Sequence, residues 1–258
     1  MNVAGATVVV TGASSGIGRE TAIAFAKAGA SLVLAARRED RLRAIAEEIE
    51  RHGRRALPVP TDVTRVEDVA LLVAATRDAF GGCDVLVNNA GIPGGGRFLD
   101  ARPERIDQVV RTNLLAVLAV TKAFLPSMVA AGHGHVVNVG SIAGLVAVPG
   151  AAVYSATKHA VLAFSEALDG EVASSGVRVT SVNPGLVRTE GFPQEGVPGP
   201  LLVETERVAA TIVRVVRKGT APSVAVPRSA GTLRALHGLA PPLFRAGVRT
   251  SRRVRPAR

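Results

Sequence analysis

Short apolar runs alternate with helical patterns along most of the chain, and this alternation restricts the fold more than any other feature. Runs such as Thr7–Val10 (TVVV) and Val136–Val139 (VVNV) are rich in β-branched residues and apolar at nearly every position. Strands of that kind are buried on both faces, as in a parallel sheet. The other expected strands are Ser31–Ala35, Ala56–Val59, Val85–Asn88, Val177–Val182 and Ser223–Val226.

Helical stretches of suitable length separate these runs. They are Gly18–Ala28, Arg38–Arg51, Val66–Phe80, Pro103–Leu125, Tyr154–Ser174 and a stretch near Glu204–Lys218. Strands that alternate with such helices form βαβ units. The sequence therefore predicts the α/β class, with a single doubly wound Rossmann-type domain and a mostly parallel seven-stranded sheet that carries helices on both faces. We expect this domain to span residues 1–228, and residues 229–258 to form a basic C-terminal extension rather than an independent domain.

The positive charge of the chain is concentrated near its C-terminus. The net charge is +10, yet residues 207–258 hold twelve Lys or Arg and no Asp or Glu, which leaves a net charge of −2 for residues 1–206. Aromatic residues make up only 3% of the chain, which disfavours stacking on nucleic-acid bases, so we do not expect nucleic acid as a partner. The basic tail either acts as a solvated segment or contacts anionic lipid or an acidic carrier protein.

The cysteine, histidine and apolar content indicates where in the cell the protein is expected and whether it binds a metal. A single Cys83 fits a reducing, cytoplasmic location, with peripheral membrane association through the basic tail as an open alternative. We find no secretory signal and no uncharged apolar run of the roughly 18 to 20 residues that a membrane-spanning helix needs. The five His are scattered, and no metal is expected. His133 and His135 flank a glycine, and we expect a turn there, before the fifth strand.

A glycine-rich motif directly follows the first expected strand. The segment Thr11–Gly18 reads TGASSGIG, and its glycines allow positive φ angles and leave no Cβ to block a diphosphate. The helix that begins there offers free N–H groups. The alternative is an ordinary strand-to-helix turn. The expected cofactor contacts in this motif are Gly12, Ser14, Ser15, Gly16, Ile17 and Gly18.

The end of the second expected strand indicates which dinucleotide is bound. The chain reads AARRE there, with no carboxylate before Glu39, whereas a site for NAD usually carries an acidic residue for the ribose 2′-hydroxyl. Guanidinium groups suit a 2′-phosphate. We therefore predict NADP(H) as the cofactor, with Arg37 as the leading contact and Arg38 as the second. Two solvated surface arginines are the alternative.

Several motifs in order resemble those of the short-chain dehydrogenases/reductases, from about Thr7 to Thr189. They are Thr11–Gly18, Asp62-Val63, Asn88–Gly91, Asn113, Ser141, Tyr154–Lys158 (YSATK) and Pro184-Gly185. The resemblance implies a Rossmann-type oxidoreductase that moves hydride between a nicotinamide and a carbonyl or alcohol.

The four expected catalytic residues are Asn113, Ser141, Tyr154 and Lys158. Tyr154 and Lys158 are four residues apart, so on a helix they share a face, and an ammonium near a phenol lowers the phenol pKa. Tyr154 is then the general acid/base, while Lys158 also holds the nicotinamide ribose and Ser141 hydrogen-bonds the substrate oxygen and the Tyr154 hydroxyl. The resemblance implies that Asn113 holds a water near Lys158. Its alternative role is that of a polar residue that bends or caps a helix.

The resemblance also implies further cofactor contacts. Asp62 and Val63 flank the adenine in this reading, and Asn89, Ala90 and Gly91 close over the adenosine ribose and pack the central strands. The nicotinamide contacts are Pro184, Gly185, Val187 and Thr189. Ordinary turn chemistry at strand ends is the alternative for all of them.

The expected substrate is a mostly apolar small carbonyl compound or alcohol. Ile142–Val153 is small or apolar, with Leu145, Val146 and Val148 as expected pocket walls. The segment from Thr189 to Pro200 resembles the mobile substrate lid of the family, and Phe192 is its expected apolar contact. The family also implies a homo-oligomer, a dimer or tetramer, to which the apolar stretch Leu114–Val120 contributes. A catalytically silent protein that senses NADP(H) is the alternative function.

Overall fold

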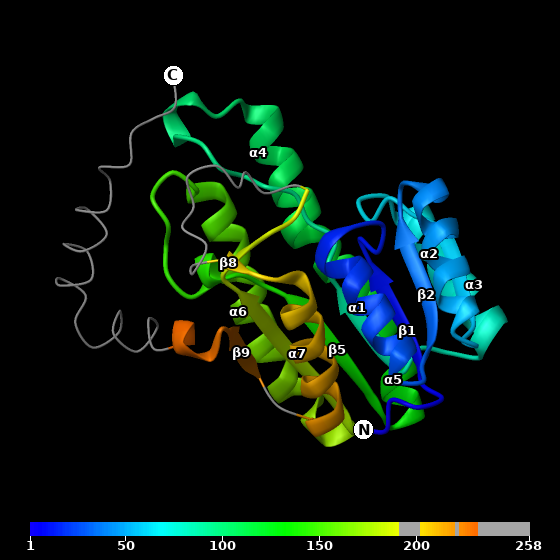
Figure 1. Cartoon of the computed structure of the whole chain (residues 1–258). Helices are drawn as coiled ribbons and strands as arrows, with labels where there is room; N and C mark the ends of the chain where they lie inside the picture. The colour runs from blue at the N-terminus through cyan, green and yellow to red at the C-terminus, as the bar shows by residue number, and fades with distance from the viewer. Residues whose placement is uncertain (191–201, 220–221, 232–258) are drawn as a thin grey trace.

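Seven parallel strands form one sheet in the part of the chain that the structure, a computed structural model, describes: residues 1–190, 202–219 and 222–231 (Figure 1). The strand order is β3-β2-β1-β4-β5-β6-β9, and every neighbouring pair is parallel. This confirms the predicted doubly wound α/β fold. The strands are β1 (Thr7–Thr11), β2 (Ser31–Ala36), β3 (Ala56–Pro60), β4 (Val85–Asn88), β5 (Gly134–Val139), β6 (Val177–Pro184) and β9 (Ser223–Val226).

Helices cover both faces of the sheet. One face is covered by α1 (Gly16–Lys27), α2 (Glu39–Arg51) and α7 (Thr205–Lys218), and the other by α3 (Val66–Phe80), α5 (Ala116–Ala131) and α6 (Ala152–Val172). In Figure 1, α4 (Pro103–Val110) stands apart from these layers, above the end of the sheet. The short helical turns are η1 (Phe98–Asp100), η2 (Arg111–Leu115), η3 (Ile142–Gly144), η4 (Ala173–Ser175) and η6 (Arg228–Gly231).

The unbroken apolar strands follow from this double cover. In β1, Val8 and Val10 belong to the core on the α1 side, whereas Val9 belongs to the core on the α5 side. All three are fully buried. Because successive side chains of a strand point to opposite faces, a strand covered on both sides needs apolar residues at every position.

Three details differ from the prediction. The expected turn at His133–His135 is wrong, because β5 already begins at Gly134 and the buried His135 ring lies 2.9 Å from the Thr180 hydroxyl in β6. The helix expected at Pro103–Leu125 is continuous but longer, since α4, a π-helical turn at η2 and α5 together run to Ala131. Two short strands, β7 (Leu186–Val187) and β8 (Leu202–Val203), pair in a second sheet that the sequence did not predict.

The continuous helical stretch Pro103–Ala131 is long and apolar enough to cross a membrane by length and composition alone, with a mean hydropathy of 1.9 over its most apolar window. In the structure this stretch contains α5, whose Phe124 and Met128 pack in the same core as the strand residues Leu86 and Val136. Part of its apolar character is therefore used to cover the sheet.

The described part of the chain ends at Gly231. Nearly all of the predicted basic extension, 229–258, lies outside the described residues, so the domain boundary at residue 228 stays a prediction. The expected apolar contact Phe192 also lies outside them, in residues 191–201.

Candidate active site

The glycine motif forms a tight turn between β1 and α1. Gly12 and Gly16 have φ angles of +66° and +53°, which L side chains rarely adopt. A Cβ at Gly18 would lie 2.5 Å from the Asn89 amide nitrogen, and closer still to the Gly12 carbonyl oxygen. The turn therefore needs glycine at these positions, and it leaves the first N–H groups of α1 open to an anion.

Asn89 ties this turn to the end of β4. Its side-chain nitrogen donates to the carbonyl oxygens of Thr11 at 2.9 Å and Gly12 at 3.3 Å. The main-chain N–H groups of Asn89 and Ala90 donate to the Thr11 hydroxyl at 3.0 and 3.1 Å. The bonds to Thr11 join the ends of β4 and β1, which fits the packing of the central strands that was expected of Asn89, and the bond to Gly12 also holds the glycine-rich turn.

The two arginines after β2 lie in different places. The Arg38 guanidinium donates to the hydroxyls of Ser14 at 3.0 Å and Ser15 at 2.9 Å, so it lies on the glycine-rich turn. The charge of Arg37 acts on Asp62. Arg38, predicted as the second contact, is therefore the arginine that the structure places against the turn.

Asp62 lies in a local turn after β3. Its carboxylate accepts hydrogen bonds from the N–H group of Thr64 at 2.9 Å and from the Thr64 hydroxyl at 2.7 Å. Partial burial opposes ionisation, but the bonds from Thr64 and the charges of Arg37 and Arg65 lower the pKa of Asp62 below its usual value. Asp62 is therefore a carboxylate at neutral pH, and its neighbour Val63 is buried.

Ser141 and Tyr154 meet at the end of β5. Ser141 follows that strand, and its hydroxyl accepts a 3.1 Å hydrogen bond from the Ala143 N–H group. The Ser141 side chain lies near enough to the Tyr154 hydroxyl to act on its pKa. Burial raises the pKa of Tyr154 above its usual value, and the interaction with Ser141 offsets part of that rise.

Lys158 lies one helical turn after Tyr154 and is 6% exposed. Its ammonium donates a 2.8 Å hydrogen bond to the Val139 carbonyl and lies 5.7 Å from the centre of the Tyr154 ring. Burial lowers the pKa of Lys158 to about 8. The expected net lowering of the Tyr154 pKa is wrong for this structure, because burial outweighs the favourable contact with Ser141, and Lys158 makes its hydrogen bond to Val139.

Asn113 is fully buried in the π-helical turn between α4 and α5. Its side-chain oxygen accepts from the Ile92 N–H group at 2.8 Å, and its nitrogen donates to the Ile92 carbonyl at 2.9 Å. A Cβ built on Gly91 would lie 3.3 Å from the Asn113 oxygen and 3.9 Å from the Lys158 nitrogen, so both side chains approach the same glycine. Isolated π-helical turns are frequent at functional sites.

The expected nicotinamide contacts lie at the end of β6 and beyond it. Pro184 ends β6, the Gly185 N–H group donates to the Val226 carbonyl at 2.8 Å, and Val187 is buried. Thr189 instead reaches the glycine-rich turn, since a Cβ on Gly16 would lie 3.2 Å from the Thr189 methyl group.

The expected substrate walls differ in exposure. Leu145 and Val146 are buried, whereas Val148 is 38% exposed. Val148 is therefore the wall residue most open to a ligand.

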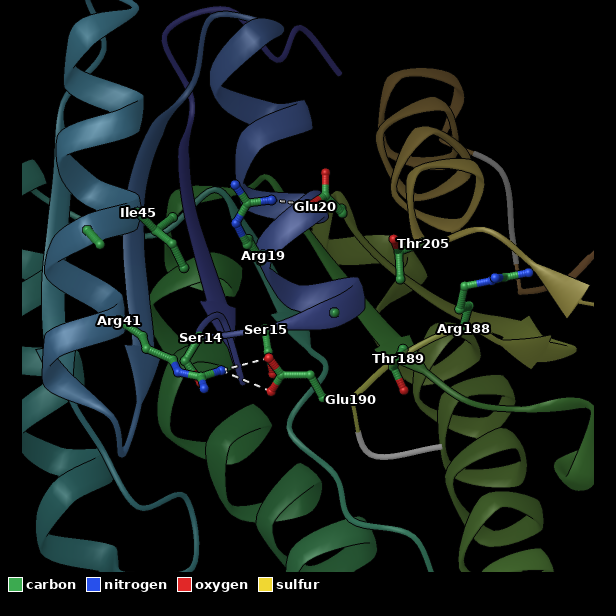
Figure 2. Close-up of a pocket in the computed structure, with 12 residues that line it drawn as sticks. Ser14, Ser15, Arg19, Glu20, Arg41, Ile45, Arg188, Thr189, Glu190 and Thr205 are labelled. Atoms are coloured by element: carbon green, nitrogen blue, oxygen red, sulfur yellow. Dashed lines mark hydrogen bonds and ion pairs between the residues drawn. The ribbon is translucent and has the colours of Figure 1, made fainter. Parts of the chain in front are cut away.

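A cavity of about 520 Å³ opens beside the glycine-rich turn (Figure 2). Its lining includes Ser14, Ser15 and Gly16 from the turn, Arg41 from α2, and Glu190. No group of three or more His, Cys, Asp or Glu gathers as a metal site among the described residues.

The arrangement of a glycine-rich turn after β1 and a Ser–Tyr–Lys group after β5 agrees with comparisons to known proteins. The family model described as short chain dehydrogenase matches residues 6–196. The chain belongs to the short-chain dehydrogenase family.

Similar proteins of the short-chain dehydrogenase family are oxidoreductases. An uncharacterized oxidoreductase of Staphylococcus haemolyticus is 39% identical over 209 residues, which cover 81% of this chain and 90% of that protein. A crystal structure of a variant actinorhodin polyketide ketoreductase with NADPH is 35% identical, with a TM-score of 0.80 and coverage of 86% of this chain and 95% of that chain. A 3-ketoacyl-(acyl-carrier-protein) reductase from Brucella melitensis, complexed with NADH, is 29% identical with a TM-score of 0.80, and the match covers 87% of this chain and 97% of that chain.

Three features of this dehydrogenase site were missed from the sequence. They are the Val139 carbonyl that holds Lys158, the Ile92 main chain that holds Asn113, and the Arg41–Glu190 ion pair. The first two use main-chain groups, which carry no residue-type signal. The third joins residues 149 positions apart, a distance over which spacing gives no guidance.

Proposed function

We propose that this protein is an NADP(H)-dependent oxidoreductase that transfers hydride between the nicotinamide and the carbonyl or secondary alcohol of a mostly apolar small molecule. Tyr154 is the general acid/base. The observation that carries the proposal is that Ser141 acts on the Tyr154 hydroxyl, while the Lys158 ammonium lies 5.7 Å from the Tyr154 ring centre, one turn further along α6. Membership of the short-chain dehydrogenase family supports the reaction class.

The residues present suit a dinucleotide with a 2′-phosphate. The glycine-rich turn has no room for side chains at Gly12 or Gly18, so a diphosphate can approach the main chain. Arg38 on the turn and Arg37 near Asp62 supply guanidinium groups for the 2′-phosphate. The remaining proposed contacts are Asp62 and Val63 for adenine, Asn89, Ala90 and Gly91 for the adenosine ribose, Lys158 for the second ribose, and Pro184, Gly185, Val187 and Thr189 for the nicotinamide. When bound, the cofactor supplies or accepts the hydride.

Tyr154 moves the proton that accompanies hydride transfer. Because burial raises its pKa, the phenol is protonated at neutral pH and donates its proton to the substrate oxygen in the reduction direction. The Ser141 hydroxyl stabilises the charge that develops on that oxygen. Lys158, with a pKa of about 8, loses and regains a proton near neutral pH and thereby returns the proton to Tyr154. In oxidation the same proton moves the other way.

We place the substrate next to Val148 and Tyr154, and we propose a dimer or tetramer in the cytoplasm as the working form. The exposed Leu115, 47% accessible at the end of η2, supports association through this helix, since an exposed apolar side chain favours contact with another surface. Contact of the basic tail with anionic lipid or an acidic carrier remains part of the proposal.

The direct experiment follows NADPH consumption by absorbance against a panel of apolar ketones and aldehydes. We expect turnover with at least one apolar carbonyl compound and none with the Tyr154→Phe variant, while both proteins bind NADPH. A folded protein that binds NADPH but consumes none across a wide panel would instead support the silent sensor.

A further inference from the structure

The Glu190 carboxylate lies against two arginines of the cofactor side of the molecule. The Arg41 guanidinium contacts both carboxylate oxygens at 2.9 Å, and Arg38 reaches one of them at 3.4 Å. Figure 2 shows Glu190 and Arg41 facing each other beside Ser14 and Ser15. An anionic group of this chain therefore occupies the guanidinium cluster next to the glycine-rich turn.

Arg38 and Arg41 form one cluster at the start of α2. Arg38 is the N-cap residue of that helix, Arg41 lies in its first turn, and both guanidinium groups reach the Glu190 carboxylate. Arg38 also donates hydrogen bonds to the hydroxyls of Ser14 and Ser15, so the cluster lies directly beside the glycine-rich turn. Two guanidinium forks beside hydroxyl groups match the oxygens of a phosphate monoester.

We propose that Arg41, together with Arg38, binds the 2′-phosphate of NADP(H) at the position of the Glu190 carboxylate, and that the cofactor displaces Glu190. This inference rests on the proposed function and adds two points to it. Arg41 contributes to the specificity for NADP(H), and the Glu190 carboxylate competes with the 2′-phosphate for the two arginines. NADH has no 2′-phosphate and leaves the ion pair intact. The competitor therefore weakens NADP(H) binding and sets the affinity of the site for its cofactor.

The ion pair is well suited to displacement. The side chains of Glu190 and Arg41 are 61% and 42% exposed, and exposed ion pairs contribute little to stability. A phosphate monoester carries more charge and one more oxygen than a carboxylate, so it gains more from two guanidinium groups. Hydrogen bonding and charge from Arg41, aided by Arg38, lower the pKa of Glu190, so the carboxylate is charged at neutral pH and competes there.

The test compares cofactor affinities of matched variants by calorimetric titration. We expect Glu190→Gln to tighten NADPH and adenosine 2′,5′-bisphosphate about two- to fivefold, the range of an exposed ion pair. Arg41→Gln is expected to weaken both ligands about tenfold, because a charged hydrogen-bond pair to phosphate is lost. NADH and adenosine 5′-monophosphate should bind all variants equally.

Arg43→Gln is the matched control, since Arg43 lies on the same helix but pairs with Glu39. It should leave every affinity unchanged. The combination of Arg41→Gln with Glu190→Gln separates competition from general charge effects: most of the gain from Glu190→Gln should vanish without Arg41. All variants change exposed side chains, and circular dichroism verifies that they fold.

The outcomes separate this inference from the proposed function. If the wild type binds NADPH and the bisphosphate, but neither Glu190→Gln nor Arg41→Gln changes their affinities, the proposed displacement of Glu190 is wrong and the oxidoreductase proposal stands. An equal gain for NADH and NADPH in Glu190→Gln also overturns it, because the effect then has no link to the 2′-phosphate. If the wild type binds neither NADPH nor the bisphosphate, the NADP(H) dependence itself fails, and this inference fails with it.

Discussion

The Lys158 ammonium donates a 2.8 Å hydrogen bond to the carbonyl oxygen of Val139, the last residue of β5. The lysine is also confined along its own helix, because a Cβ on Gly144 would lie 2.5 Å from the Lys158 carbonyl oxygen. A central strand and a closely packed turn thus hold the same residue. The ammonium lies near the Tyr154 ring because the last residue of β5 accepts its hydrogen bond, so a strand of the main sheet fixes this part of the site.

Replacing this lysine should change how stability depends on pH. Burial lowers the pKa of Lys158 from 10.5 to about 8. Between those values the unfolded chain keeps a proton that the folded protein has lost, so the folded state gains stability as pH rises. At 1.36 kcal/mol per pKa unit, the gain reaches about 3 kcal/mol above the unfolded pKa, and it is lost as pH falls through about 8.

The measurement is urea unfolding of the wild type and Lys158→Met across this pH range. The free energy of unfolding of the wild type should rise relative to that of the variant as the pH increases. Lys122→Met, a change at another lysine, serves as the control for general pH effects. A wild-type to Lys158→Met difference that does not change with pH would contradict a buried, titrating Lys158.

Tyr154→Phe should reduce kcat by about 10² to 10⁴-fold, the usual contribution of a positioned general acid. NADPH affinity should stay within a factor of about two, because the phenol hydroxyl contacts Ser141 and the aromatic ring is retained. Ser141→Ala should also reduce kcat, and it should raise the pKa of Tyr154 further, since the interaction with Ser141 lowers that pKa. Stopped-flow and titration experiments separate the two effects, and a normal kcat in Tyr154→Phe would exclude the proposed role.

The fold could be predicted almost entirely because its signal is local. Each strand of the main sheet is a short apolar run, and each expected range lies within about two residues of the observed one, as for Ser31–Ala35 and β2. Double cover of the sheet leaves this signal in every strand. The strands β7 and β8 have two residues each, too few for any periodicity, so they were not predictable.

The site could be predicted only where residue type and spacing carry the chemistry. The YSATK spacing places Tyr154 and Lys158 on one face of α6, and the structure keeps them there. The pKa of Tyr154 was predicted in the wrong direction, because spacing reveals proximity to a charge and not burial, which acts in the opposite sense. Arg38 contacts the glycine-rich turn and Arg37 acts on Asp62 because their side chains point in different directions at the end of β2. The sequence does not specify these directions.

Asn113→Leu should destabilise the protein by about 2 to 4 kcal/mol. The change leaves the N–H and carbonyl groups of Ile92 without their buried partners, and each unsatisfied group costs about 1–3 kcal/mol. Gln108→Leu, in the adjacent helix α4, is the control, and it should have little effect. Thermal unfolding gives the stabilities, and equal melting temperatures for Asn113→Leu and the wild type would contradict the two hydrogen bonds.

If Asn113 also takes part in proton movement, its loss should affect kcat more than stability explains. We expect kcat of Asn113→Leu to fall at temperatures well below its melting temperature, with a smaller fall for Asn113→Asp, whose carboxylate still accepts from the Ile92 N–H group. Unchanged kcat in a folded Asn113→Leu variant would limit Asn113 to the structural role in the π-helical turn.

Alanine at two glycines should have opposite effects on stability. Gly18→Ala places a Cβ against the Gly12 carbonyl and the Asn89 side chain, so the turn must open. We expect a loss of more than about 2 kcal/mol, in the range of overpacking, together with loss of NADPH binding. Gly170→Ala, in the exposed part of α6, meets nothing within 4 Å and should stabilise the protein by up to about 1 kcal/mol. Chemical denaturation of both variants measures the difference. If Gly18→Ala is as stable as Gly170→Ala and still binds NADPH, the glycine-rich turn does not need the close approach of Gly18 to Gly12.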